Sequence, residues 1–108
     1  MKVPEITHLQ FFVLQSLLDG EQTGEGIRGD LAEVGVKKSL PAFYQLMSRL
    51  EESGLVKGRY EQLVIDGQPV KQRWYKMSAP GRRAWESTSE FYVQLSAAGK
   101  GGLAHGLL

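Results

Sequence analysis

The chain has 108 residues, of which 42% are hydrophobic and 23% are charged, and this is the composition of one globular domain. It contains no cysteine, which excludes disulfides, thiolate metal sites and cysteine nucleophiles. The formal net charge of +1 alone does not indicate a polyanionic partner.

The first 20 residues have neither the pattern of a signal peptide nor that of a membrane span. They contain one lysine and a short apolar stretch that Gln and Ser interrupt, and they have no small-residue cleavage site. Together with the absence of cysteine, this favours a cytoplasmic protein.

Charge is distributed unevenly along the chain. Residues 1–36 contain two basic and six acidic residues, a balance of −4, whereas residues 37–83 contain ten basic and four acidic ones, a balance of +6. The positive charge therefore lies in the middle of the chain, and a negatively charged partner would bind there.

The first helix is predicted to begin near Thr7, where Thr-His-Leu-Gln has the form of a capping box, and to end at Asp19-Gly20. It is apolar on most sides. We therefore expect it to be the central helix of the core.

A second helix is expected between Thr23, its N-terminal cap, and Gly35, which ends it. Its apolar positions recur at helical spacing: Ile27, Leu31 and Val34. Residues 24–29 fit the G-x-G-x-x-G pattern of dinucleotide binding, but they follow a helix and a polar turn, and Glu25 lies where a phosphate would bind. We therefore expect these glycines to permit close helix packing or to loosen the helix instead.

The third helix has the clearest boundaries. Ser39 is suited to cap it, Pro41 falls in its first turn and Gly54 ends it. An apolar stripe runs along it: Phe43, Leu46, Met47 and Leu50. Only residues 35–38 separate the second and third helices, which is the brief connection of a helix-turn-helix unit.

Two β-like runs follow, over residues 57–65 and 70–77, and Asp66-Gly67 with Pro69 marks the turn between them. A last helix is expected to start at Ser78 and to run to about Ala98. The remaining residues are rich in glycine.

Three short helices followed by a hairpin are the plan of a winged helix-turn-helix domain, in which one helix enters the major groove of DNA. We therefore expect a mainly α fold with a small β-hairpin (α+β). Residues 1–78 would form the winged helix domain, residues 79–98 an added C-terminal dimerisation helix, and residues 99–108 a flexible tail.

Six short motifs stand in one order along most of the chain, from about Ile6 to Phe91: Thr23-Gly24, Phe43-Tyr44, Leu50-Glu51, Gly54-Leu55-Val56, Arg73-Trp74-Tyr75-Lys76-Met77-Ser78 and Gly81. Their order and spacing resemble those of PadR-type transcriptional regulators. The resemblance implies a homodimeric repressor that binds a near-palindromic operator and is released by a small phenolic or multidrug-like effector, or by other signals. Family members usually have Gly or Ser where this chain has Pro41, and rarely have residues as neutral as Ala42 and Gln45 on the side facing the groove.

The resemblance also implies that one side of the third helix faces double-stranded DNA: Ser39, Ala42, Tyr44, Gln45, Ser48 and Arg49. Gln45 would read adenine, and Arg49 would contact a phosphate or guanine. A plain solvated helix face is the alternative. Tyr44 could equally be a packed ring with its hydroxyl at the surface.

Basic residues flank the third helix on both sides. Four of them lie on the hairpin: Lys57, Arg59, Lys71 and Arg73. An excess of one sign on a small hairpin favours phosphate contacts over a plain solvated face. Lys37 and Lys38 directly precede the third helix and are placed to hold phosphates together with its free N–H groups.

The last helix carries apolar positions at a spacing of close to 3.5 residues: Trp85, Thr88, Phe91, Tyr92 and Leu95. We expect this stripe to form a homodimer interface, and the alternative is a cleft for a small aromatic effector.

No catalytic or cofactor site is predicted. His8 and His105 are the only histidines, and no carboxylate lies at ligand spacing around either, so we expect no metal, no cofactor and no enzymatic activity. The alternative function is a winged-helix module that docks an acidic protein partner.

Overall fold

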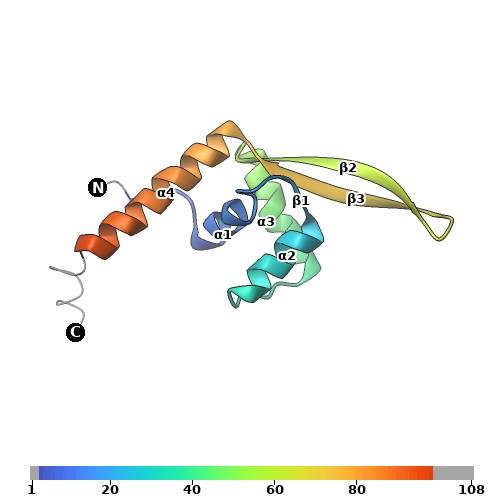
Figure 1. Ribbon diagram of the computed structural model, residues 1–108, viewed down its shortest axis with the longest axis horizontal. Coiled ribbons are helices and arrows are strands. Elements are labelled where there is room, and N and C mark those ends of the chain that lie inside the picture. Colours follow the sequence, from blue (N-terminus) through green and yellow to red (C-terminus); the bar gives the residue numbers. More distant parts are fainter. Residues whose placement is uncertain (1–2, 99–108) are drawn as a thin grey trace.

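The computed structural model describes residues 3–98, and its elements follow the predicted order with one addition (Figure 1). The elements are α1 (His8–Ser16), β1 (Gln22–Thr23), α2 (Gly24–Glu33), α3 (Leu40–Glu52), β2 (Val56–Ile65), β3 (Gln68–Met77) and α4 (Ala79–Ala98). The three strands form one antiparallel sheet. The α+β winged-helix prediction is therefore confirmed, and the predicted tail lies outside the described residues.

The start of α1 is the predicted capping box. The side-chain oxygen of Thr7 accepts a hydrogen bond from the Gln10 N–H at 3.1 Å, and the Gln10 side chain accepts one from the Thr7 N–H at 3.0 Å. The predicted end at Asp19-Gly20 is wrong, because the helix stops at Ser16. After Ser16 the chain continues in tighter turns, in which the N–H groups of Leu17, Leu18 and Gly20 each donate to the carbonyl three residues back.

Strand β1 is the added element. It has only two residues, too few for an alternating pattern to show in the sequence. Gln22 pairs with Tyr75 and Thr23 with Trp74, so the strand order is β1-β3-β2 and β3 is the central strand. Thr23 also caps α2 as predicted, since its hydroxyl oxygen accepts from the Gly26 N–H at 3.0 Å.

In α2, Ile27 and Leu31 are buried as predicted. Val34 is exposed, so its placement in the core is wrong: it is the C-terminal cap and no longer follows the helical stripe. The expectation of close packing holds at Gly24. A Cβ there would lie 3.4 Å from the Phe43 ring and 3.6 Å from the Tyr75 ring.

One core joins the first three helices to the base of the sheet. Its buried members are Val13, Leu14, Leu17, Ile27, Leu31, Phe43, Met47, Leu50, Val56 and Tyr75. Helix α3 contributes three of the four residues of its predicted stripe. The fourth, Leu46, lies at the margin and is half-buried.

The hairpin of β2 and β3, which we call the wing, is paired over ten residues on each strand. Its two-residue turn is Asp66-Gly67, and both residues have positive φ, 51° and 76°. Pro69 is not in the turn as predicted. It lies in β3 opposite Val64, where β1 does not reach β3, and a proline is tolerated on such an outlying strand.

Ser78 joins the wing to α4. Its hydroxyl accepts from the Gly81 N–H at 3.0 Å and donates to the Gly54 carbonyl at 2.5 Å, while its N–H donates to the Leu55 carbonyl at 3.1 Å. Helix α4 therefore starts in contact with the end of α3. From this junction α4 and the wing extend in opposite directions (Figure 1). Within residues 3–98, no helix is both long and apolar enough to cross a membrane.

Candidate nucleic-acid interface

The N-terminal end of α3 is polar and open to solvent. Ser39 caps it, its hydroxyl oxygen accepting from the Ala42 N–H at 3.3 Å. Lys37 beside it is exposed, and Lys38 is half-buried. The Arg28 guanidinium donates to the Lys38 carbonyl at 3.3 Å, so a third cation lies at this helix end. Arg28 could not be predicted at this position from sequence, because its contact depends on the packing of α2 against the connection between α2 and α3.

The predicted groove-facing side of α3 does lie away from the core. Gln45, Ser48 and Arg49 are exposed, and Ala42 is half-buried. Tyr44 is partly a packed ring and partly exposed on the side predicted to face DNA. Its ring meets Phe43 edge-on at 5.4 Å between centroids, and 45% of the residue remains exposed.

The hairpin cations lie on two different faces of the sheet. Residues opposite each other in an antiparallel pair share a face, and Lys71 and Arg73 therefore lie on the face of Tyr75, which packs on the core. Lys57 and Arg59 lie on the other face. The four cations predicted to act together thus form two separate groups.

Arg73 is already paired within the chain. Its guanidinium Nη2 lies 2.5 Å from Glu51 Oε1 of α3, and the two side chains are only 23% and 28% exposed. The guanidinium also lies over the Tyr60 ring, 4.4 Å from its centroid. Summing charges over segments of the sequence could not show this pair, because the partners are 22 residues apart.

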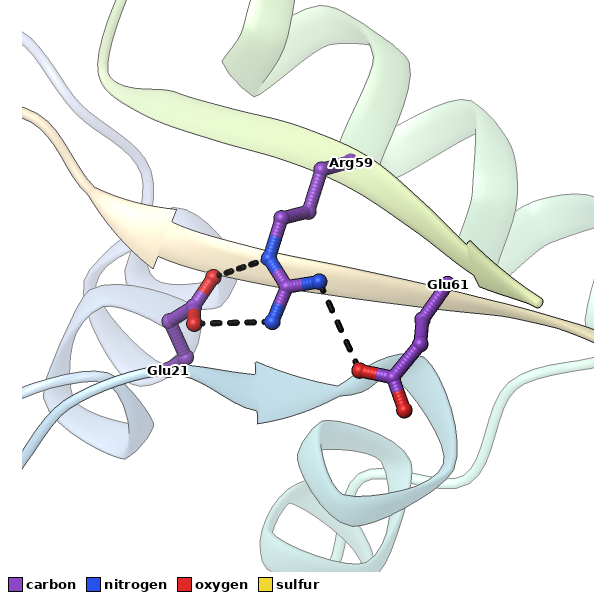
Figure 2. Close-up of polar contacts among 3 residues, drawn as sticks. All are labelled: Glu21, Arg59 and Glu61. Atoms are coloured by element: carbon purple, nitrogen blue, oxygen red, sulfur yellow. Dashed lines mark hydrogen bonds and ion pairs between the residues drawn. The ribbon is translucent and has the colours of Figure 1, made fainter. Parts of the chain in front are cut away.

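Arg59 is held by two carboxylates (Figure 2). Its Nε lies 2.8 Å from Glu21 Oε2, its Nη2 lies 3.0 Å from Glu21 Oε1, and its Nη1 lies 3.5 Å from Glu61 Oε2. The hydrogen bond from Arg59 lowers the pKa of the Glu21 carboxyl from its ordinary value. Glu21 comes from the acidic first third of the chain, which the sequence had set apart from the basic segment.

Other cations of the predicted site have no such partner. Within residues 3–98, no ion pair holds Lys37, Arg49 or Lys71. Lys71 borders a surface hollow of about 300 Å³ between the start of α2, α3 and the wing. Tyr44 and Arg73 line the same hollow, so the structure brings the exposed face of α3 next to the wing.

Two of the five residues predicted for the dimer interface, Trp85 and Tyr92, contact α1 of their own chain. Trp85 donates from its indole N–H to Gln15 Oε1 at 2.8 Å, and the Tyr92 hydroxyl lies 2.7 Å from His8 Nδ1. Thr88 is only 2% exposed, so its assignment to an interface needs correction: its own chain covers it. Phe91 and Leu95 remain half-exposed.

Another surface hollow lies elsewhere on α4. It measures about 410 Å³ and is lined by the N-terminal segment, the start of α1, the end of α3 and α4: Val3, Pro4, Glu5, Ile6, Gln10, Ser53, Leu55, Ala84, Ser87 and Thr88. The alternative cleft of Trp85, Phe91, Tyr92 and Leu95 would lie between two subunits, and none of these four residues lines this hollow. Across the described residues, no group of three or more His, Asp or Glu side chains could hold a metal ion.

Comparison with known proteins gives structural neighbours only. No family model matches the sequence, and no curated protein does. A PadR family transcription regulator from Clostridium difficile has 15% sequence identity, covers 90% of this chain and 99% of its own, and gives a TM-score of 0.76. BpsR of Bordetella bronchiseptica, whose DNA binding is regulated by 6-hydroxynicotinic acid, has 20% identity, with 93% and 70% coverage and a TM-score of 0.65.

The structure of a third neighbour is that of a complex with DNA. PadR of Bacillus subtilis, in complex with operator DNA, has 19% identity and a TM-score of 0.63. The match covers 75% of this chain but only 46% of that one. These likenesses agree with the helix order, the wing and the added α4 described above. In fold, the chain is therefore similar to these PadR-type regulators.

Proposed function

We propose that the chain is a sequence-specific DNA-binding transcription regulator that places α3 in the major groove and the wing against the DNA backbone. The observation that carries the proposal is the shared hollow between Tyr44 on α3 and Lys71 on the wing. The hollow brings the exposed side of α3, which we propose to read bases, beside a cation that no ion pair within residues 3–98 holds. A structural neighbour with the same fold binds operator DNA, which supports the proposal.

Each part of the interface has its own task. Gln45 on the exposed side of α3 has the paired donor and acceptor that suit adenine, and Arg49 suits guanine or a phosphate. Lys37 and the free N–H groups at the start of α3 suit a backbone phosphate. Lys71 suits a second phosphate along the wing. Arg59 and Arg73 are removed from this set because carboxylates of the chain hold them.

Repression and a homodimeric state are part of the proposal. A helix-turn-helix dimer binds two half-sites about one helical turn apart, which fits a near-palindromic operator. On α4, Phe91 and Leu95 lie about one helical turn apart and are half-exposed, so apolar surface is available beyond the contacts with α1. Burial of this surface against a second copy would stabilise the dimer.

A small aromatic effector is also proposed. The hollow of about 410 Å³ has the size of a small-ligand site, and it lies between α4 and the end of α3. Regulation of BpsR by 6-hydroxynicotinic acid supports this kind of control in the fold.

The test is a fluorescence-anisotropy titration with the DNA upstream of the chain's own gene, at two salt concentrations. Binding should weaken steeply with salt, and Lys71→Ala should weaken it about five- to tenfold while reducing the salt slope by about one. Lys57→Ala is the matched control: it removes the same charge from the opposite face and should change binding little. Equal effects of the two variants, or no salt-dependent binding, would contradict the proposal.

An acidic protein partner is the second candidate. Lys57 and Lys76 lie directly opposite each other on the face away from Lys71, beside a hollow of about 400 Å³ that Glu21 and Arg59 also line. Two like charges in that arrangement favour an anion. A stoichiometric protein complex that duplex DNA does not displace would support this function over DNA binding.

A further inference from the structure

Glu21 and Arg59 connect the two outer strands of the sheet. Glu21 lies in the turn just before β1, Arg59 lies in β2, and the central strand β3 runs between them (Figure 2). Strand β1 itself pairs with β3 at only two positions. The ion pair therefore adds to the core contacts at the base of the sheet and to the Arg73–Glu51 pair, and it reaches β2 from the side of β1.

The position of the guanidinium is fixed from several sides. Two hydrogen bonds to Glu21 hold it in a bidentate geometry, Glu61 lies at its third nitrogen, and the Trp74 ring lies beneath it, 5.5 Å from Cζ to the ring centroid. Two carboxylates surround one guanidinium, so this group of three charges is negative overall. Arg59 therefore offers a DNA phosphate less than an unpaired cation would, although Lys57 and Lys76 line the same hollow.

The Glu21–Arg59 pair lies at the base of the wing, where a small rotation would move the wing tip by a large distance. Six residues of β2 separate Arg59 from the wing turn, a distance of roughly 20 Å along an extended strand. Beyond Trp74 the wing has no third strand beside it. A change in the angle of its base would therefore move the wing tip by several times the displacement at Arg59.

We infer that Glu21 and Arg59 form a clamp that sets the direction of the wing, and that Arg59 is a positioning residue for DNA binding and not a phosphate contact. The second half of this inference rests on the proposed DNA-binding function. The first half concerns the free protein and stands without it.

The first experiment measures wing direction without DNA. Because the sequence has no cysteine, Gln68→Cys at the wing end and Glu33→Cys at the end of α2 give two unique labelling sites. Spin-label distances should broaden and shift in Glu21→Arg and in Arg59→Glu. The double reversal Glu21→Arg/Arg59→Glu should restore the original distance, since it rebuilds the pair with exchanged charges. Lys57→Glu, on the same face, is the control and should leave the distance unchanged.

The second experiment measures DNA binding by the same variants. Arg59→Glu should weaken binding about fivefold or more, and the added Glu21→Arg should recover most of that loss. Glu21→Gln should weaken binding without changing the salt slope. A phosphate contact predicts the opposite: no rescue by Glu21→Arg, and a slope reduced by about one in Arg59→Gln.

The two failures are distinguishable. If even the unaltered chain binds no DNA at low salt, the proposed function fails, and the label distances alone decide the clamp. If the chain binds DNA but neither single charge reversal changes the label distance, the clamp is overturned. It is also overturned if the double reversal restores neither the distance nor the affinity.

Discussion

At the scale of single residues, the environment of a charge decides what it can do. Arg59, Lys71 and Arg73 all lie on the wing, yet two of them are held by carboxylates of the chain and one is not. Arg73→Ala is therefore a poor probe of DNA contact, because it would also leave the half-buried Glu51 carboxylate without its partner. Lys71 is the better probe, since its removal leaves no buried group unpaired.

The clamp between Glu21 and Arg59 is expected to fail in acid. Its hydrogen bond lowers the pKa of Glu21 from the ordinary value of 4.5. The clamp is therefore fully present above that ordinary value, and it is lost as the pH falls through the lowered pKa. The label distance should broaden between about pH 7 and about pH 3, with circular dichroism used to show that the helices persist. Glu21→Gln should give the broadened distance at both values.

At the scale of elements, local signals in the sequence were enough to place the starts of three helices. Thr7, Thr23 and Ser39 each cap the predicted helix, because a cap needs only a hydroxyl and an N–H three residues on. Asp66-Gly67 was equally readable as a turn. What the sequence could not show was set by tertiary contacts: β1 exists because β3 lies beside it, and α1 ends early through turn hydrogen bonds.

The start of α4 gives a prediction at this scale. A Cβ on Gly81 would collide with the Leu55 carbonyl oxygen, and that oxygen belongs to the backbone and cannot rotate away. Gly81→Ala should lower the free energy of unfolding by about 1 to 3 kcal/mol, measured by urea denaturation. Gly29→Ala is the matched control in α2, where a Cβ meets nothing within 4 Å. It should leave stability unchanged or increased.

At the scale of the whole molecule, the acidic residues 1–36 and the basic residues 37–83 do not form separate surfaces in the fold. Glu21 reaches the wing from the acidic first third, and Glu51 reaches it from α3. Of the cations predicted to contact DNA, Arg59 and Arg73 are thereby paired with carboxylates, whereas no ion pair within residues 3–98 holds Lys37, Arg49 or Lys71. Such long-range pairs depend on the packed fold, and residue order alone does not contain them.

The proposed dimer gives a prediction at the same scale. Leu95→Glu should shift sedimentation equilibrium from dimer to monomer, because it places a charge in the apolar surface of α4 that a second copy would cover. Ser96→Glu adds the same charge one position along, at an exposed residue, and should leave the dimer intact. A monomeric unaltered chain, or equal effects of the two variants, would rule out α4 as the interface.

Two hydrogen bonds from Ser78 join the start of α4 to Gly54 and Leu55, directly after α3, so α4 is attached to the end of α3. In the proposed dimer, the two α3 helices would then be connected to each other through the pair of α4 helices at its centre. Whatever changes the crossing angle of that pair would change the separation of the α3 helices, and so the half-site spacing that the dimer accepts. A ligand could therefore release such a dimer from DNA without touching either DNA-facing surface.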